Sequence, residues 1–120
     1  MKIFNTSKIL KKFRGSALAI GNFDGTHKGH QKVFLKAKTL AKQNKTKFGI
    51  LTFHPLPVMF FNKNLKNYRL VSEEHKNKLL NKNGVNFVIK IKFNKNFSRI
   101  KAHDFIKKII HKNINPKFIL

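Results

Sequence analysis

Short apolar runs alternate with amphipathic segments along this chain, and that alternation limits the possible folds more than any other feature. Four runs have the length and composition of buried strands: residues 16–21, 47–53, 86–91 and 116–120. Helical periodicity fills the intervals between them, at residues 28–44, 72–84 and 102–113. Strands that alternate with helices form parallel sheets covered by helices. The sequence therefore predicts one α/β domain with a parallel sheet flanked by helices.

Apolar stripes and end signals support the three helices. The stripe of the first helix is expected to consist of Val33, Phe34, Ala37, Leu40 and Ala41. That of the third helix is expected to consist of Phe105, Ile106, Ile109 and Ile110. The second helix has Ser72 as a candidate N-cap, Glu73 and Glu74 in its first turn, and Gly84 as its stop.

Composition narrows the class of protein. At 120 residues and 41% hydrophobic content, the chain suits one globular domain. It has no cysteine, which excludes disulfides and cysteine-based metal sites. No apolar run is long enough to span a membrane, and the N-terminus lacks the pattern of a signal peptide. We expect a cytoplasmic protein with no membrane partner; the oligomeric state is not predicted.

The formal net charge of +23 raises the alternative of a basic nucleic-acid-binding module. Its thirteen phenylalanines among lysines are compatible with base stacking. However, the lysines are scattered over every segment and arginine is scarce, although arginine is the side chain best suited to bind phosphate and guanine. Compositional drift of an AT-rich gene explains the charge better, and we predict no nucleic-acid partner.

The stretch "GNFDGTHKGH", residues 21–30, joins the first strand to the first helix. In parallel sheets, ligands bind beyond the carboxyl ends of the strands, and a helix N-terminus there attracts phosphate. His27 and His30 are three residues apart, so they share one face of the first helical turn. Gly29, between them, has no side chain that would obstruct the approach of an anion to the two imidazoles. Two imidazoles so placed can stabilise the negative charge that develops on phosphorus during nucleotidyl transfer.

Other interpretations of this stretch are weaker. The G-x-x-x-x-G-K-[ST] phosphate loop is absent, which excludes that ATPase class. Zinc on His27 and His30 needs a further ligand, such as His54 or His103, and the chain has no acidic cluster, so we predict no metal ligands. A simple glycine turn does not account for two histidines and three glycines at this position.

The same residues resemble a known family. H-x-G-H after a first strand is the signature of the nucleotidylyltransferase superfamily, and "IGNFDGTHKGHQ" resembles the FAD synthetase module of bacterial bifunctional riboflavin kinase/FAD synthetases. "LTFHPLPVMFF" is similar to the T-F-[acid]-P-x-P flavin loop of that module, and "RLVSEEHKNKLLNKNGVNFVIKIKF" to its L-T-x-x-x-[KR]-x-x-L-L-x-x-x-G-V-[DN] segment. "FSRIKAHDFIKKIIHKNINPKFIL" is similar to the segment that leads into the fourth strand of the module. The resemblance implies a Rossmann-like nucleotidylyltransferase fold.

The resemblance also implies a reaction and a set of site residues. The family transfers AMP from ATP to FMN, which gives FAD and pyrophosphate, with Mg²⁺. The implied catalytic residues are His27 and His30. The implied ATP-binding residues are Gly21, Asn22, Phe23, Asp24, His27, Gly29 and His30. The implied flavin-binding residues are Phe53, Pro55, Pro57 and Phe61.

The chain departs from the family pattern in two ways. His54 replaces the acid of the flavin loop, and Leu56 replaces a polar residue. The family continues with a G-x-[DN]-F-x-F-G loop, an I-S-S-T-x-[IV]-R segment and a riboflavin kinase barrel, none of which occurs in these 120 residues. We therefore expect residues 1–120 to be the N-terminal portion of an FAD synthetase domain, incomplete at its C-terminus, with little or no activity of its own. Alternatives are another H-x-G-H transferase, acting on nicotinamide or phosphopantetheine precursors, and an inactive remnant.

Overall fold

A parallel five-stranded sheet forms the centre of the molecule. The computed structural model describes residues 1–23, 28–54 and 73–120. Neighbouring strands in it follow the order β1-β4-β3-β2-β5, and every pair is parallel. The strands are β1 (Lys2–Phe4), β2 (Ala17–Ile20), β3 (Phe48–His54), β4 (Phe87–Lys92) and β5 (Phe118–Ile119). The predicted parallel sheet is confirmed, and β1 is a fifth strand that the sequence analysis missed.

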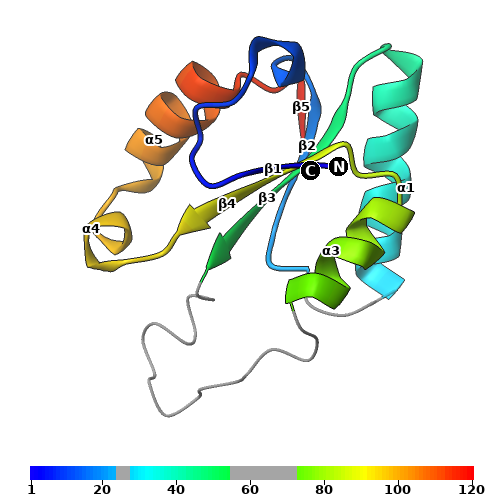
Figure 1. The fold of residues 1–120 in the computed structure, drawn as a ribbon. Coiled ribbons are helices and arrows are strands. Elements are labelled where there is room, and N and C mark those ends of the chain that lie inside the picture. Colours follow the sequence, from blue (N-terminus) through cyan, green and yellow to red (C-terminus); the bar gives the residue numbers. More distant parts are fainter. Residues whose placement is uncertain (24–27, 55–72) are drawn as a thin grey trace.

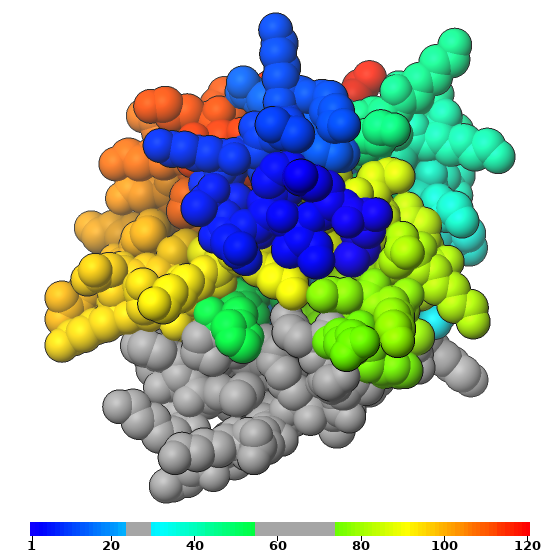
Figure 2. Space-filling model, in the orientation of Figure 1, coloured from blue at the N-terminus to red at the C-terminus, as the bar shows by residue number. Residues whose placement is uncertain are grey.

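Helices cover both faces of this sheet (Figure 1). One face carries α1 (Lys28–Gln43) and α3 (Glu73–Lys82). The other carries the short helix η1 (Lys11–Phe13) and, after β4, the segments α4 (Lys95–Ser98), α5 (Ala102–Asp104) and η2 (Phe105–Ile114). Figure 2 shows the N-terminal segment, in blue, at the surface between α3 and α4. No helix in the described ranges is long and apolar enough to cross a membrane.

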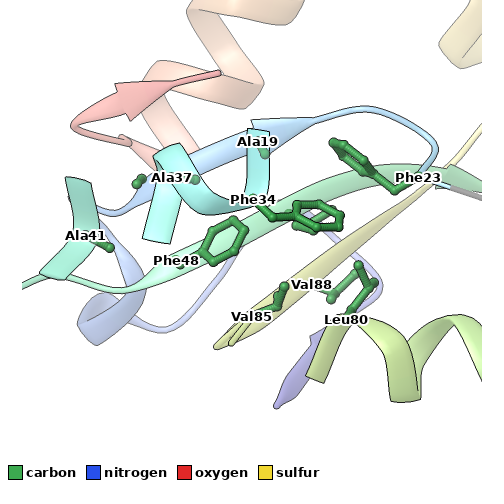
Figure 3. Packing of buried hydrophobic residues seen from close by; sticks show 11 residues of the cluster. Ala19, Phe23, Phe34, Ala37, Ala41, Phe48, Leu80, Val85 and Val88 are labelled. Carbon is green, nitrogen blue, oxygen red and sulfur yellow. The ribbon is translucent and has the colours of Figure 1, made fainter. Parts of the chain in front are cut away.

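Alternation along the strands divides the core into two layers. In β2, Ala17 and Ala19 face α1, whereas Leu18 faces η2. The alanines leave room for α1 to pack closely on the sheet, and Phe34 of α1 and Leu80 of α3 fill the layer above it (Figure 3). The stripe predicted for the first helix is confirmed, because its members are buried or half-buried against this layer.

The end of α3 also agrees with the sequence. Gly84 adopts a φ of +84°, and the Val85 N–H donates to the Leu80 carbonyl at 3.1 Å, which closes the helix. Glycine adopts this left-handed conformation without the steric penalty that a Cβ brings. The candidate N-cap Ser72 lies outside the described residues.

The third predicted helix differs from the expected α-helix. Residues 105–114 form a π-helix, in which hydrogen bonds join residues five apart. Its buried residues are Ile110 and Ile114, while Ile106, predicted to face the core, is 58% exposed. The wider turn moves Ile106 off the core face. Asn115, with a φ of +47°, ends the helix, and its N–H donates to the Ile110 carbonyl at 2.7 Å.

Candidate active site

The glycine-rich stretch begins where the order of the strands reverses. From β2 the chain adds β3 and then β4 on one side, and it later returns to place β5 on the other side of β2. Ligands in open parallel sheets bind beyond the carboxyl ends of the strands at such a switch point. Gly21, Asn22 and Phe23 follow the carboxyl end of β2, and α1 begins at Lys28. The predicted position of the two described ends of this stretch, after β2 and at the start of α1, is confirmed.

Gly21 and Phe23 form a compact turn at this edge. The Gly21 N–H donates to the Leu51 carbonyl at 3.0 Å, which ties the turn to β3. Phe23 adopts a φ of +44° and is buried, with its ring over Gly21. A Cβ at Gly21 would lie 3.0 Å from that ring, so only glycine fits here without a shift. Asn22 is exposed.

His30 lies in the first turn of α1, next to the Phe23 ring. The two rings meet edge to face, with centroids 4.9 Å apart and planes at 70°. A second aromatic neighbour, Phe34, has its centroid 6.4 Å from that of His30. His30 is half-buried at the positive end of the helix dipole. An imidazole at a helix N-terminus is suited to donate a hydrogen bond to an anion there.

The structure describes only part of the predicted nucleotide site. It brings together Gly21, Phe23 and His30, with Asn22 beside them. The backbone of Gly29 belongs to α1. Asp24 and His27 lie outside the described residues.

Phe53, predicted to face the flavin, lies at the carboxyl end of β3 on the η2 side of the sheet. It packs against Phe97 and Phe105, with ring centroids 5.6 and 6.4 Å away. A pocket of about 240 Å³ opens there. Its lining residues are Phe53, Phe93, Phe97, Ser98, Ile100, Ala102 and Phe105. The predicted flavin residues Pro55, Pro57 and Phe61 lie outside the described residues.

The sequence analysis did not single out Phe93 and Phe97, and it predicted Phe105 only as part of the apolar stripe of the third helix. The available signal was the density of phenylalanine just after the third predicted strand, in "KFNKNF". These rings contact one another at centroid distances of 5.6 and 5.9 Å, so they form one aromatic wall.

Lys76 is a second feature that the sequence analysis missed. Its side chain is 2% exposed, and its Nζ donates to the Thr52 hydroxyl at 3.3 Å. Thr52 is itself buried near the carboxyl end of β3. The available signal was a lysine four residues before Leu80, on the apolar stripe of α3. Among residues 1–23, 28–54 and 73–120, no three His, Cys, Asp or Glu side chains gather to hold a metal ion.

Comparison with known proteins decides the family. The profile of the FAD synthetase family matches residues 9–120. This chain belongs to the FAD synthetase family. It is 36% identical over 121 residues to the bifunctional riboflavin kinase/FMN adenylyltransferase of Buchnera aphidicola from Schizaphis graminum, which matches all of the chain. The protein of the same description from Escherichia coli K12 is 29% identical over 88% of the chain.

The chain spans between one third and two-fifths of the length of these relatives: 39% of the Buchnera protein and 34% of the Escherichia coli protein. A solved structure described as a macrolide-efflux protein from Streptococcus pneumoniae matches 98% of the chain, which covers 39% of that structure. Its TM-score is 0.80 at 25% sequence identity. The Rossmann-like α/β fold expected for the family is thereby confirmed.

Proposed function

We propose that this chain takes part in FMN adenylyl transfer. A phosphate oxygen of FMN attacks the α-phosphorus of ATP, the bond from that phosphorus to the bridging oxygen breaks, and FAD and pyrophosphate form. The observation that carries the proposal is the position of His30, in the first turn of α1 at the switch point of the sheet. Membership of the family supports the same reaction.

His30 acts on the ATP phosphates in this proposal. In the transition state, negative charge grows on the oxygens around the α-phosphorus, and an imidazole N–H fixed at the helix N-terminus stabilises it. His27, predicted to share the same helical turn, supplies a second donor. Gly21, Asn22, Phe23, Asp24 and Gly29 shape the nucleotide loop around them. Because the imidazoles are fixed before the reaction, little reorganisation is needed as the charge develops.

The aromatic pocket beside Phe53 supports FMN as the acceptor. A flavin ring system needs apolar walls, and the rings of Phe53, Phe93 and Phe97 offer them at the carboxyl edge of the sheet. Pro55, Pro57 and Phe61 complete the flavin loop in this proposal.

Mg²⁺ enters with ATP as the substrate complex. In this proposal the ATP phosphates supply the main ligands of the ion, as is usual for Mg²⁺ at nucleotide sites. The lack of cysteine suits a reducing compartment, and we assign the reaction to the cytoplasm.

Binding and turnover measurements test the proposal. Titration calorimetry with ATP and Mg²⁺, and quenching of FMN fluorescence, are expected to show binding of both ligands, and chromatography reports any FAD formed. Binding of neither ligand by the folded chain overturns the proposal. Preference for nicotinamide mononucleotide or phosphopantetheine over FMN favours another H-x-G-H transferase. Tight, strongly salt-dependent retention of DNA or RNA, without ATP binding, favours the basic nucleic-acid module.

A further inference from the structure

Lys76 and His30 occupy equivalent places on two neighbouring helices. His30 precedes Phe34 by four residues in α1, and Lys76 precedes Leu80 by four residues in α3. Phe34 and Leu80 belong to one buried cluster on the same face of the sheet (Figure 3). Both helices run back along the parallel strands, so one turn toward their N-termini leads to the carboxyl edge. Lys76 therefore lies on the α1 side of the sheet, toward the edge at which α1 begins and His30 lies.

Thr52 ties the Lys76 ammonium to the same edge. The Nζ–Oγ1 distance is 3.3 Å, and both side chains are at most 2% exposed. Thr52 directly follows Leu51, whose carbonyl accepts the hydrogen bond from Gly21, the first residue of the nucleotide turn. The positive charge is thus attached to the strand that anchors the turn.

Burial increases the reach of this charge. An exposed lysine is screened by water and salt. Burial disfavours the charged form of a lysine unless an anion lies nearby, and a buried ammonium acts on such an anion through a lower effective dielectric. An ammonium fixed beside the phosphate-binding edge stabilises a polyanion and has little effect on a neutral ligand. Lys78, on the same helix, is 74% exposed, so water and salt screen its charge.

We propose that Lys76 is a positioning residue of the nucleotide site, which holds the end of β3 through Thr52 and supplies a fixed positive charge that strengthens binding of the ATP triphosphate. The inference rests on the proposed function, since it assigns a further residue to the same site. It predicts discrimination by ligand charge, which a purely structural lysine does not provide.

The test compares ATP with adenosine. Lys76→Met keeps most of the side-chain volume and removes the charge, and Lys78→Met removes a charge from the exposed face of the same helix. We expect Lys76→Met to weaken ATP binding about tenfold or more while adenosine binding stays within about twofold. Lys78→Met is expected to leave both affinities unchanged. Equal ATP affinity of the folded Lys76→Met variant and the unchanged chain, or an equal loss for ATP and adenosine, overturns the inference.

Two further variants keep the test decisive if Lys76→Met does not fold. Lys76→Arg retains the charge and is expected to retain ATP affinity. Thr52→Val retains the lysine but removes its hydrogen bond, and it is expected to weaken ATP binding more than adenosine binding. A Thr52→Val variant that binds ATP as the unchanged chain does contradicts the inference. Failure of the unchanged chain to bind ATP overturns the proposed function, and this inference with it, so the two failures are distinguishable.

Discussion

Phe23 and His30 lie edge to face across the turn that joins β2 to α1, with ring centroids 4.9 Å apart. Phe23 also contacts Phe34 of the core, at a centroid distance of 5.1 Å. One residue of the predicted nucleotide loop therefore links the core of the domain to its predicted catalytic histidine. This arrangement makes the orientation of His30 depend on the packing of Phe23.

Removal of the Phe23 ring is expected to destabilise the fold as well as the site. Phe23→Ala leaves a cavity beside Gly21 and His30, and burial of a phenylalanine makes this cost about 3 kcal/mol in the free energy of unfolding. Urea denaturation followed by circular dichroism measures it. Asn22→Ala, at an exposed neighbour, is the control and is expected to change stability by less than about 0.5 kcal/mol. Equal denaturation midpoints for the two variants contradict the packing described for Phe23.

Substitution of Gly49 tests the close packing of the Phe87 ring of β4 against β3. The Phe87 ring occupies the space where a Cβ on Gly49 would lie, and Phe87 is fully buried. Gly49→Ala is expected to lower the free energy of unfolding by about 3 kcal/mol, because the ring has nowhere to move. Gly15→Ala is the matched control: it has open space but a φ of +75°, so only a backbone cost of about 1 kcal/mol is expected. A smaller loss for Gly49→Ala than for Gly15→Ala would mean that the core adjusts to the extra methyl group.

His30→Ala tests the predicted catalytic role. Loss of a hydrogen bond to a charged phosphate, worth about 1.5–3 kcal/mol, is expected to weaken ATP binding about tenfold or more. Any FAD formation is expected to fall about 10²–10³-fold. His103→Ala, at an exposed histidine of α5, is the control and should behave as the unchanged chain. Unchanged ATP binding and FAD formation in a folded His30→Ala variant refute the assignment.

Much of this architecture follows from local sequence pattern. The strand–helix alternation predicted the parallel sheet, because each apolar run was short and bounded by glycine, proline or lysine. The spacing of Phe34, Ala37 and Ala41 predicted the buried face of α1. The position of the glycine-rich stretch after β2 predicted its place at the sheet edge, since parallel strands end on one side.

The missed features depend on contacts between distant residues. β1 has only three residues, and its pairing with β4, Ile3 opposite Val88, is visible only in the folded chain. The π-helical turn that exposes Ile106 has the same apolar residues as an α-helix, so periodicity does not distinguish the two. The sequence analysis did not single out Lys76, because its burial and its contact with Thr52, 24 positions away, are visible only in the folded chain.

Substitution of Phe97 tests whether the aromatic pocket beside Phe53 is the flavin site. Its ring contacts Phe53 and Phe93 with centroids 5.6 Å away in each case, so Phe97→Ala removes one wall of the pocket. Since an aromatic pair contributes about 0.5–1.5 kcal/mol, FMN affinity is expected to fall about two- to tenfold, as measured by fluorescence quenching. ATP affinity should be unchanged, because Phe23, in the predicted nucleotide turn, packs on the opposite face of the sheet.

Phe118→Ala supplies the matched control for this experiment. Phe118 is also a half-buried phenylalanine, but it packs with the α1 layer on β5, away from Phe53. Both variants lose a ring and are expected to lose stability, so thermal unfolding identifies a temperature at which each is folded. At that temperature only Phe97→Ala should weaken FMN binding. An equal loss in both variants indicates a general effect on the fold, and no loss in Phe97→Ala means that FMN binds elsewhere.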